Sequence, residues 1–457
     1  MTYAFYFDST YCSGCKACQA ACKDKNDLPA GVLWRRVYEV SGGTWEQSGD
    51  AWNNTVFAYN LSLACNHCVH PKCAGVCPVD AYYVRDDGIV ILDSSKCVGC
   101  GYCAWACPYG APQYNPQTGS MTKCDFCYDN LDQGQPPACV AACPMRVLDY
   151  GEAETREGME LWNTSPETHP FPLPMFSHTR PHLAIQPHAA MQTSQEKFVA
   201  NQEEIQPRTP SAWEDVPLIF FTLLGQLAVG GFWVMWILTD RGIPTWNLLP
   251  HLIIGTSLGI GVFSSFAHLG TKKNAWRVLS HLSHSWLSRE ILFAGLFGLS
   301  WLTTALVSVT GHQVMFEAMA VTSIFGIGLV YSMSQVYRIP AAPGWNTWRT
   351  NAGFVVSALL LGLSVMAPMF LDTGFPFEYI NIGILVLLLV EILLIWASSK
   401  DRLYQNLRKG LMFLGILLSI FNIVSSADVL WLSILVFVFV AMEEGLGRWL
   451  FYRSRLA

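Results

Sequence analysis

All sixteen cysteines of this 457-residue chain lie in its first third, where they form four groups of four. The groups are Cys12, Cys15, Cys18 and Cys22; Cys65, Cys68, Cys73 and Cys77; Cys97, Cys100, Cys103 and Cys107; and Cys124, Cys127, Cys139 and Cys143. Four cysteine thiolates hold one cubane iron–sulfur cluster, and sixteen cysteines divide into four such sets without remainder. The sequence therefore predicts four [4Fe-4S] clusters whose iron is bound by these cysteines.

The spacing of the third group, C-x2-C-x2-C-x3-C followed by Pro108, is the run found in bacterial ferredoxins. Pro78 and Pro144 follow the last cysteines of the second and fourth groups in the same way. In two-cluster ferredoxins the fourth cysteine of a run binds the other cluster of the pair. Each cluster is therefore expected to take three ligands from one group and one from a partner group.

Three other interpretations of the cysteines are weaker. A disulfide framework is typical of small secreted chains. Zinc sites use paired C-x2-C elements and lack the ferredoxin run. His67 and His70 lie inside the second group and invite comparison with a Rieske centre. Since cysteine already supplies every ligand there, we expect both to be ordinary loop histidines.

Composition divides the chain into three parts. We expect a ferredoxin-like α+β domain at 1–150, a proline-rich segment at 151–213 and a membrane anchor at 214–457. The middle segment holds eight of the 24 prolines, and proline at that density favours extended backbone over helix. It is either a free linker or an arm laid along another surface. Its apolar residues, including Leu183 and Ile185, favour the arm.

The last part of the chain contains apolar stretches that are long enough to cross a membrane, which needs about 20 residues. Eight stretches qualify: 216–238, 248–268, 290–310, 314–336, 352–371, 379–397, 409–426 and 428–447. Buried helices of a soluble protein could explain one of them but not eight in succession. The predicted fold class is thus a multi-domain α+β protein, in which an all-α polytopic bundle of eight helices follows the cysteine-rich domain.

Loop charges predict the orientation. With eight spans, the cysteine domain, the even-numbered loops and the C-terminus share one side. That side carries ten cations between the spans, namely Lys272, Lys273, Arg277, Arg289, Arg338, Arg349, Lys400, Arg402, Arg408 and Lys409, against Arg241 alone on the other. The positive-inside rule makes the richer side cytoplasmic. The strand-like start at 3–7 also leaves no room for an export signal. We therefore expect a multi-pass protein of the inner (cytoplasmic) membrane with a cytoplasmic cysteine domain. A periplasmic face is the alternative, if a partner subunit exports the folded domain.

Ionisable residues at membrane depth are costly and often functional. His268 closes the second predicted span and Glu290 opens the third. A buried carboxylate near a histidine can take up the protons that a quinol sheds on oxidation, so these two residues are a candidate quinol site. The alternative is an ordinary pair of interfacial polar residues.

Further polar residues lie in the spans. Glu391 is either a proton relay or a partner in a helix–helix hydrogen bond, and the second is favoured. Gln226 is expected to make an interhelical hydrogen bond, and Glu443 and Glu444 are expected near the membrane interface. Histidines are not placed at facing depths as a dihaem anchor requires, so no haem is expected.

Other classes of function find little support. The net charge of −6 argues against nucleic acid as a partner. There is no phosphate-cradling glycine loop and no nucleophile paired with a general base. The protein is therefore expected to move electrons rather than to catalyse the chemistry of a terminal substrate.

The two halves resemble, in chain order, the electron-transfer subunit and the membrane-anchor subunit of dimethyl sulfoxide (DMSO) reductase-type molybdoenzymes, fused into one polypeptide. The first half carries this resemblance through its four cysteine groups and through 97–114, CVGCGYCAWACPYGAPQY. The second half carries it through five short stretches: 217–222 (PLIFFT), 230–232 (GGF), 268–270 (HLG), 287–291 (LSREI) and 445–452 (GLGRWLFY).

The resemblance implies a set of cluster ligands. These are Cys12, Cys15, Cys18 and Cys143 for the first cluster; Cys22, Cys124, Cys127 and Cys139 for the second; Cys65, Cys68, Cys73 and Cys107 for the third; and Cys77, Cys97, Cys100 and Cys103 for the fourth. Some relatives replace one cysteine of the third group with tryptophan and hold a three-iron cluster. This sequence keeps Cys100, so four cubanes are expected.

The resemblance also implies a function. Electrons from menaquinol, bound near His268 and Glu290, would pass through the clusters to a separate molybdopterin-containing catalytic subunit. The same relay could run in reverse, as in cytoplasm-facing, quinone-reducing complexes such as sulfite dehydrogenases. Two other hypotheses are a redox-driven transporter and a passive anchor without a working quinone site.

Overall fold

The computed structural model describes residues 2–153, 179–190, 215–240, 248–310, 315–371, 377–395, 402–425 and 430–456. The protein forms two compact units. The first comprises residues 1–209 together with 273–277, and the second comprises residues 210–272 and 278–457. The short stretch 273–277 thus belongs to the cysteine-rich unit, although the sequence places it between two membrane helices.

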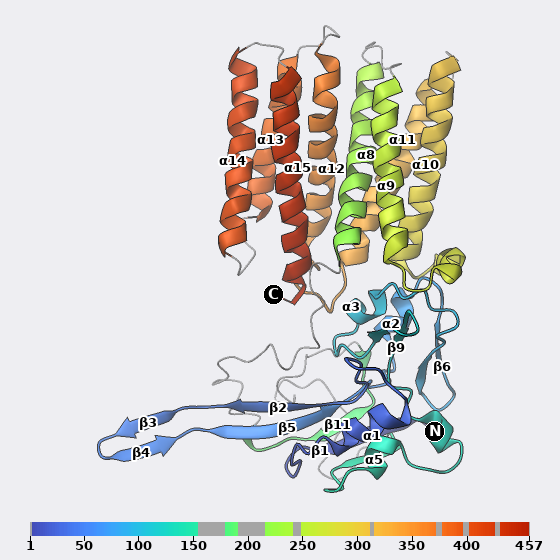
Figure 1. Ribbon diagram of the computed structural model, residues 1–457, viewed down its shortest axis with the longest axis vertical. Helices are drawn as coiled ribbons and strands as arrows, with labels where there is room; N and C mark the ends of the chain where they lie inside the picture. The colour runs from blue at the N-terminus through green and yellow to red at the C-terminus, as the bar shows by residue number, and fades with distance from the viewer. Residues whose placement is uncertain are drawn as a thin grey trace. The chain divides into compact units, whose positions relative to one another are not determined.

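The first unit is built from strands and short helices (Figure 1). Its strands are β1 (Tyr3–Asp8), β2 (Arg36–Gly42), β3 (Trp45–Ser48), β4 (Ala51–Asn54), β5 (Phe57–Leu63), β6 (Tyr82–Val84), β7 (Val90–Leu92), β8 (Gln113–Asn115), β9 (Ser120–Thr122), β10 (Leu148–Glu152) and β11 (Leu183–Gln186). Its helices are α1 (Ala17–Lys25), α2 (Lys72–Val76), α3 (Tyr102–Ala106), α4 (Tyr128–Leu131) and α5 (Ala138–Ala141).

One three-stranded sheet joins the two ends of this unit. Strand β1 pairs antiparallel with β10 and parallel with β11, so Phe5 lies opposite both Tyr150 and Leu183. The other strands form two-stranded hairpins: β2–β5, β3–β4, β6–β7 and β8–β9. Strand β11 comes from the proline-rich segment, and Leu183 and Ile185 are buried. Residues 183–186 thus form part of this sheet, and most of the proline-rich segment lies outside the described residues.

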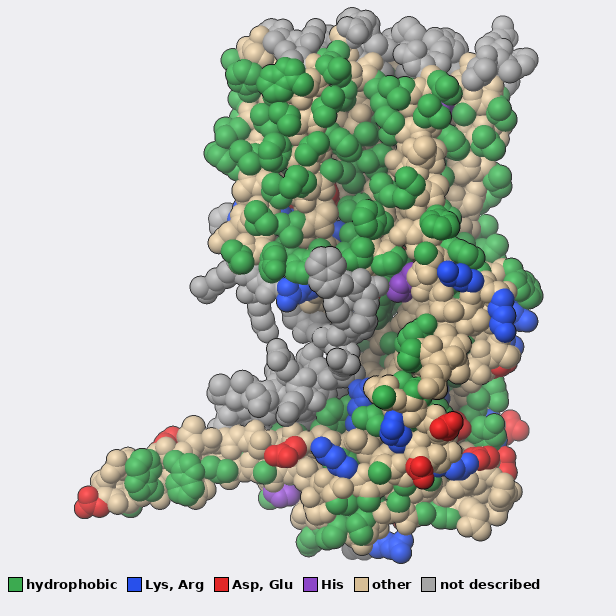
Figure 2. Space-filling view, in the orientation of Figure 1, with side chains coloured by type: hydrophobic (Ala, Val, Ile, Leu, Met, Phe, Trp, Pro, Cys, Tyr) green, Lys and Arg blue, Asp and Glu red, His purple; other side chains and the backbone are tan. Residues whose placement is uncertain are grey.

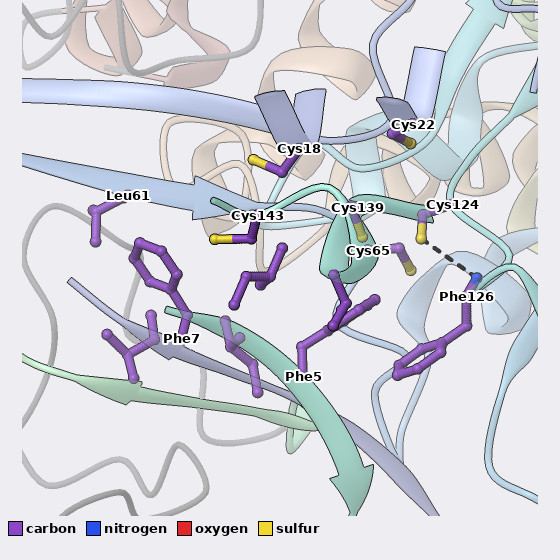
Figure 3. Close-up of a cluster of buried hydrophobic side chains, with 14 of the residues drawn as sticks. Phe5, Phe7, Cys18, Cys22, Leu61, Cys65, Cys124, Phe126, Cys139 and Cys143 are labelled. Atoms are coloured by element: carbon purple, nitrogen blue, oxygen red, sulfur yellow. Dashed lines mark hydrogen bonds between the residues drawn. The ribbon is translucent and has the colours of Figure 1, made fainter. Parts of the chain in front are cut away.

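The core of the first unit combines aromatic side chains with cysteines (Figure 3). Phe5 of β1 stacks on Phe126, with ring centroids 4.0 Å apart. Both rings are almost fully buried, as is Phe7. Because stacked rings bury much apolar area with little side-chain entropy to lose, they form a rigid wall beside the thiols.

The second unit is a bundle of long helices (Figure 1). Those described are α8 (Val216–Asp240), α9 (Leu248–His268), α10 (Trp286–Thr310), α11 (Met315–Tyr337), α12 (Trp348–Met366), α13 (Phe377–Ile395), α14 (Arg402–Ser425) and α15 (Leu430–Arg453). All of these except α13 meet the length and composition expected of a membrane span over their described residues. Apolar side chains cover much of the visible outer face of the bundle (Figure 2). The predicted fold class, an α+β domain followed by an all-α polytopic bundle, is confirmed.

Helix α8 is the most enclosed of the spans and packs against α9, α11, α12 and α15. Its contact with α12 is made backbone to backbone at Gly230 and Gly362. A Cβ added at Gly230 would lie 1.7 Å from the carbonyl oxygen of Ala358. Small residues allow such close approach where van der Waals packing holds membrane helices together.

Several spans begin earlier than predicted. Helix α10 begins at Trp286, α12 at Trp348 and α14 at Arg402. Each start carries an aromatic or basic residue that suits the membrane interface but lowers a hydropathy window. As a result, five of the ten counted cations lie on these three helices rather than in loops: Arg289, Arg349, Arg402, Arg408 and Lys409. Arg408 is also largely buried, and without it the count is nine cations against one.

Candidate metal centres and membrane site

All sixteen cysteines lie within the described residues, and each is a free thiol. Two helix contacts bring their groups together, since α1 packs against α5 and α2 packs against α3. Helix α1 carries Cys18 and Cys22, and α5 carries Cys139. Helices α2 and α3 carry Cys73 and Cys103. The first group therefore faces the fourth, and the second faces the third.

Two of the four predicted ligand sets line cavities. One cavity is lined by Cys12, Cys15, Cys18 and Cys143. Another is lined by Cys65, Cys68, Cys73 and Cys107. In both cases the fourth cysteine comes from the partner group. In Figure 3, Cys18 and Cys143 lie on facing segments of the same buried cluster. In these two sets the fold thus brings together three thiols from one cysteine group and one from its partner group.

The other two sets are also close enough to interact electrostatically. Burial raises the pKa of Cys22 to about 12, and negative charge on Cys139 adds to the rise. Burial likewise raises the pKa of Cys100 to about 12, with additions from Cys77 and Cys97. A buried thiolate is unfavourable unless a cation is bound beside it. Iron supplies that charge, so these thiols fit metal ligands better than free nucleophiles.

Backbone amides are directed at several sulfurs, a further feature that fits a cluster. Gly99 and Met121 donate to Sγ of Cys97 over 3.3 and 3.4 Å. Phe126 donates to Sγ of Cys124 over 3.4 Å (Figure 3). Hydrogen bonds to cluster sulfurs stabilise their negative charge and raise the reduction potential. The residues present therefore fit iron–sulfur clusters, which would supply one-electron transfer when bound.

Two buried cations lie among the cysteines, and sequence reasoning missed both. Arg35 is 2% exposed and lies near Cys18 and Cys22, where its charge opposes the rise in their pKa values. Lys123 is 3% exposed, donates to the Cys124 carbonyl over 3.0 Å and lines the cavity of Cys73. Only the position of Lys123 directly before Cys124 could have signalled this. A cation at low exposure offsets the negative charge of a cluster and favours its reduced state.

The structure gives His67 a structural role. Its ring is 1% exposed, and Nδ1 accepts a hydrogen bond from the amide of Val90 over 3.1 Å. Burial, and then the charge of Lys123, hold its pKa well below the usual value. His67 is therefore a neutral packing residue of a loop, as expected, and His70 is exposed.

Within the first unit, Asn274 is hydrogen-bonded to the main chain at the start of the third cysteine group. Its Nδ2 donates to the carbonyl oxygens of Ser95 and Cys97, over 2.7 and 2.9 Å. The side chain is 7% exposed, so both bonds are largely shielded from water. Asn274 follows His268 by only six residues in the sequence. Asn274 is therefore hydrogen-bonded to the main chain of a candidate cluster ligand.

His268 and Glu290 lie in the second unit on packed helices, α9 and α10. His268 is the last residue of α9 and is half-buried. Glu290 lies in the second turn of α10 and is 3% exposed. Its Oε1 has no hydrogen-bond partner among the described residues. An unpartnered buried carboxylate oxygen can accept a hydrogen bond or a proton from a ligand.

A buried charge network, which sequence reasoning missed, lies farther along the bundle. Arg408 of α14 binds Glu391 of α13 and donates to Glu443 of α15 over 2.6 Å. Glu443 and Glu444 are almost fully buried within the bundle. The interhelical hydrogen bond expected of Gln226 is confirmed, because its Nε2 donates to the Phe354 carbonyl over 3.1 Å.

Comparison with known proteins gives two family matches. Residues 56–153 match the family described as "4Fe-4S dicluster domain". Residues 210–408 match the family described as "DMSO reductase anchor subunit".

Curated relatives cover the N-terminal part of the sequence. The B subunit of the anaerobic dimethyl sulfoxide reductase of Escherichia coli is 45% identical over 208 residues, which are 44% of this protein and 98% of that subunit. The thiosulfate reductase electron transfer subunit PhsB of Salmonella typhi is 41% identical over 161 residues, 35% of this protein and 80% of that subunit. The formate dehydrogenase iron-sulfur subunit of Wolinella succinogenes is 38% identical over 174 residues, 33% of this protein and 82% of that subunit.

Proposed function

Because the chain belongs to the DMSO reductase family and joins its iron–sulfur subunit to its anchor subunit, we propose that it relays electrons between membrane quinol and a separate catalytic subunit. The observation that carries this proposal is the union, in one polypeptide, of sixteen converging free thiols with a helical membrane anchor. A single polypeptide can then receive electrons from a lipid-soluble carrier and deliver them to a protein outside the bilayer.

The proposed cofactors are four [4Fe-4S] clusters. Their proposed ligands are Cys12, Cys15, Cys18 and Cys143; Cys22, Cys124, Cys127 and Cys139; Cys65, Cys68, Cys73 and Cys107; and Cys77, Cys97, Cys100 and Cys103. The helix pairs α1–α5 and α2–α3 support this interleaving, as do the two cysteine-lined cavities. Arg35 and Lys123 would offset part of the clusters' negative charge inside the domain.

The proposed mobile substrate is menaquinol, with His268 and Glu290 as the groups that bind it and accept its protons. Support comes from the burial of Glu290 and from its unpartnered oxygen. Asn274, six residues after His268 in the sequence, donates two hydrogen bonds to the segment of Cys97 within the first unit.

The proposed partner is a molybdopterin-containing catalytic subunit. The matched relatives are named as parts of a DMSO reductase, a thiosulfate reductase and a formate dehydrogenase. The first two names describe reductases and the third describes a dehydrogenase, so the relay is compatible with either direction of flow. We propose flow from quinol to the catalytic subunit, and the reverse direction is the second candidate.

Anaerobic reduction of the clusters by quinol tests the proposal. The purified full chain, in lipid, is mixed with a reduced menaquinol analogue while visible absorption and electron paramagnetic resonance (EPR) are recorded. We expect the absorption and EPR signals of the clusters to show reduction after mixing, and we expect a quinone-site inhibitor to suppress this reduction. A protein whose iron is reduced by dithionite but never by quinol would be a passive anchor, and the proposal would fail.

We also propose that the protein lies in the inner membrane with its iron–sulfur unit on the cytoplasmic side. The excess of loop cations supports this orientation. A reporter that is active only outside the cytoplasm, fused to the C-terminus, should remain silent, while the same reporter inserted at 243–245 should be active. The opposite pattern would place the iron–sulfur unit in the periplasm.

A further inference from the structure

The buried glutamates of the bundle hold more negative charge than their cations balance. Three carboxylates, Glu391, Glu443 and Glu444, each place one oxygen within 4.8 Å of the others. Arg408 and Arg448 are the buried cations beside them, so three carboxylates meet two buried positive charges. Arg349 lines the same cavity, but it is only partly buried and forms no ion pair with the three carboxylates among the described residues. Charge at this depth is costly unless it is neutralised, so one further positive charge at the carboxylates would be stabilising.

The hydrogen bonds locate the oxygens that lack a donor. Arg408 is bonded to one oxygen of Glu391 and to one of Glu443. Ser357 donates to Oε2 of Glu444 over 2.8 Å. The second oxygen of each of the three carboxylates is buried and has no partner among the described residues. One oxygen of Glu391 and one of Glu444 lie within 4.8 Å of each other. Two carboxylates this close repel each other unless a proton, which the two can share, removes one negative charge.

A cavity adjoins this pair. Its volume is about 270 Å³, and its lining includes Glu391, Glu444, Arg349 of α12 and Gln405 of α14. It extends to Thr347, which precedes α12, and to Ser454, which follows α15, and thus reaches the end of the bundle. A cavity of this size with charged side chains in its lining has room for several waters, because one water occupies about 30 Å³ of liquid. Protons on the pair can therefore exchange with solvent.

Buried polar groups also lead from the pair toward Glu290. Arg448 follows Glu444 by one helical turn on α15, donates to Gln226 over 2.8 Å, and lies 3.9 Å above the ring of Phe354. Tyr452 follows Arg448 by one more turn, and its hydroxyl is hydrogen-bonded to that of Tyr337. Tyr337 and Glu290 lie close enough for their side chains to interact electrostatically.

We propose that Glu391 and Glu444 share one exchangeable proton and form a proton-holding site that serves the quinol pocket. This proposal rests on the proposed function. When a quinol is oxidised, its two O–H bonds break, two electrons leave through the iron–sulfur domain, and two protons must be accepted. Glu290 takes each proton as a new O–H bond on its carboxylate. Tyr337 and Tyr452 lie between Glu290 and Arg448. Water in the cavity that Arg448 lines would complete the path to the glutamate pair, which releases a proton to solvent.

Arg448 and Arg408 are not carriers in this route, since guanidinium groups do not lose their protons in proteins. Their two positive charges stabilise the one negative charge that remains on the protonated pair and the negative charge of Glu443, which is bound by Arg408. A sodium ion could supply the same single positive charge. It would bind to all three free oxygens, whereas a shared proton needs only two.

Infrared spectroscopy of the full chain in lipid tests the shared proton without any turnover. The expected result is a carboxylic-acid C=O band that shifts in heavy water, is absent from Glu391→Gln and Glu444→Gln, and persists in Glu378→Gln. Glu378 is an exposed residue of α13 and is the matched control. Loss of the band on adding sodium at constant pH would overturn the proposal in favour of a cation site. Absence of any such band in the unaltered protein would also overturn it.

Proton release tests the link to quinol oxidation. In the complete complex, a pH-sensitive dye and the cluster absorption are followed after one pulse of quinol. Glu444→Gln should slow proton release at least about tenfold while the first cluster reduction stays close to that of the unaltered complex. If proton release is as fast in Glu444→Gln as in the Glu378→Gln control, the proposed proton-holding site is refuted, while the proposed quinol oxidation is not. If quinol does not reduce the clusters of the unaltered complex, it is the proposed function that fails.

Discussion

Replacing Glu290 by glutamine should abolish quinol-driven electron transfer while leaving the iron–sulfur clusters intact. Glutamine keeps the size and the hydrogen-bonding ability of the side chain but cannot take up the proton that a quinol releases. Removal of a general base typically costs a factor of about 10² to 10⁴ in rate. We therefore expect quinol-dependent turnover of the complex to fall at least about 100-fold, as measured by the rate of cluster reduction after mixing with a quinol analogue.

A matched substitution separates this effect from damage to the bundle. Glu317 lies in the first turn of α11 and is exposed, so Glu317→Gln removes a carboxylate outside the proposed site. Both variants should retain the iron content and the dithionite-reduced EPR spectrum of the unaltered protein. Normal quinol turnover in Glu290→Gln would contradict the assignment of the site, whatever the behaviour of the control.

Replacing Cys107 by serine should remove the same cluster as replacing Cys73, although Cys107 belongs to a different cysteine group. Both thiols line one cavity with Cys65 and Cys68. If the four thiols hold one cubane, loss of either should remove one EPR signal and about four of about sixteen iron atoms. Iron analysis and EPR of the two serine variants, prepared without oxygen, measure this directly.

The comparison with Cys103 makes the test selective. Cys103 is only four residues before Cys107, but it lies near Cys100 and Cys77. Cys103→Ser should therefore remove a different signal from the one that Cys107→Ser removes. If both substitutions eliminated the same signal, each cluster would be held within one group, and the interleaved assignment would be incorrect.

Much of the architecture could be predicted because it depends on local patterns. The cysteine spacing indicates the ferredoxin-type arrangement directly, since few ligand geometries satisfy it. The eight apolar stretches indicate the bundle, because a bilayer demands a minimum apolar length. The second predicted span, 248–268, coincides with α9. The span predicted at 409–426 is too short, because the first turns of α14 are polar.

The features that could not be predicted depend on contacts between distant segments. Arg408 has the sequence context of a loop cation, and only tertiary packing shows that it binds Glu391 and Glu443. Arg35 resembles an ordinary surface arginine until the fold encloses it among cysteines. Asn274 gives no sequence signal of its hydrogen bonds to Ser95 and Cys97. Single-sequence patterns describe periodicity and spacing, but they do not describe pairs of side chains more than a few turns apart.

The relay depends on iron held by the sixteen thiolates, so iron content is its most direct test. The full chain should be purified in lipid or mild detergent without exposure to oxygen, and its iron and acid-labile sulfide should be counted per polypeptide. We predict about sixteen of each and a brown protein whose absorption bleaches on reduction. A folded, colourless protein that contains almost no iron, or zinc in its place, would contradict the account.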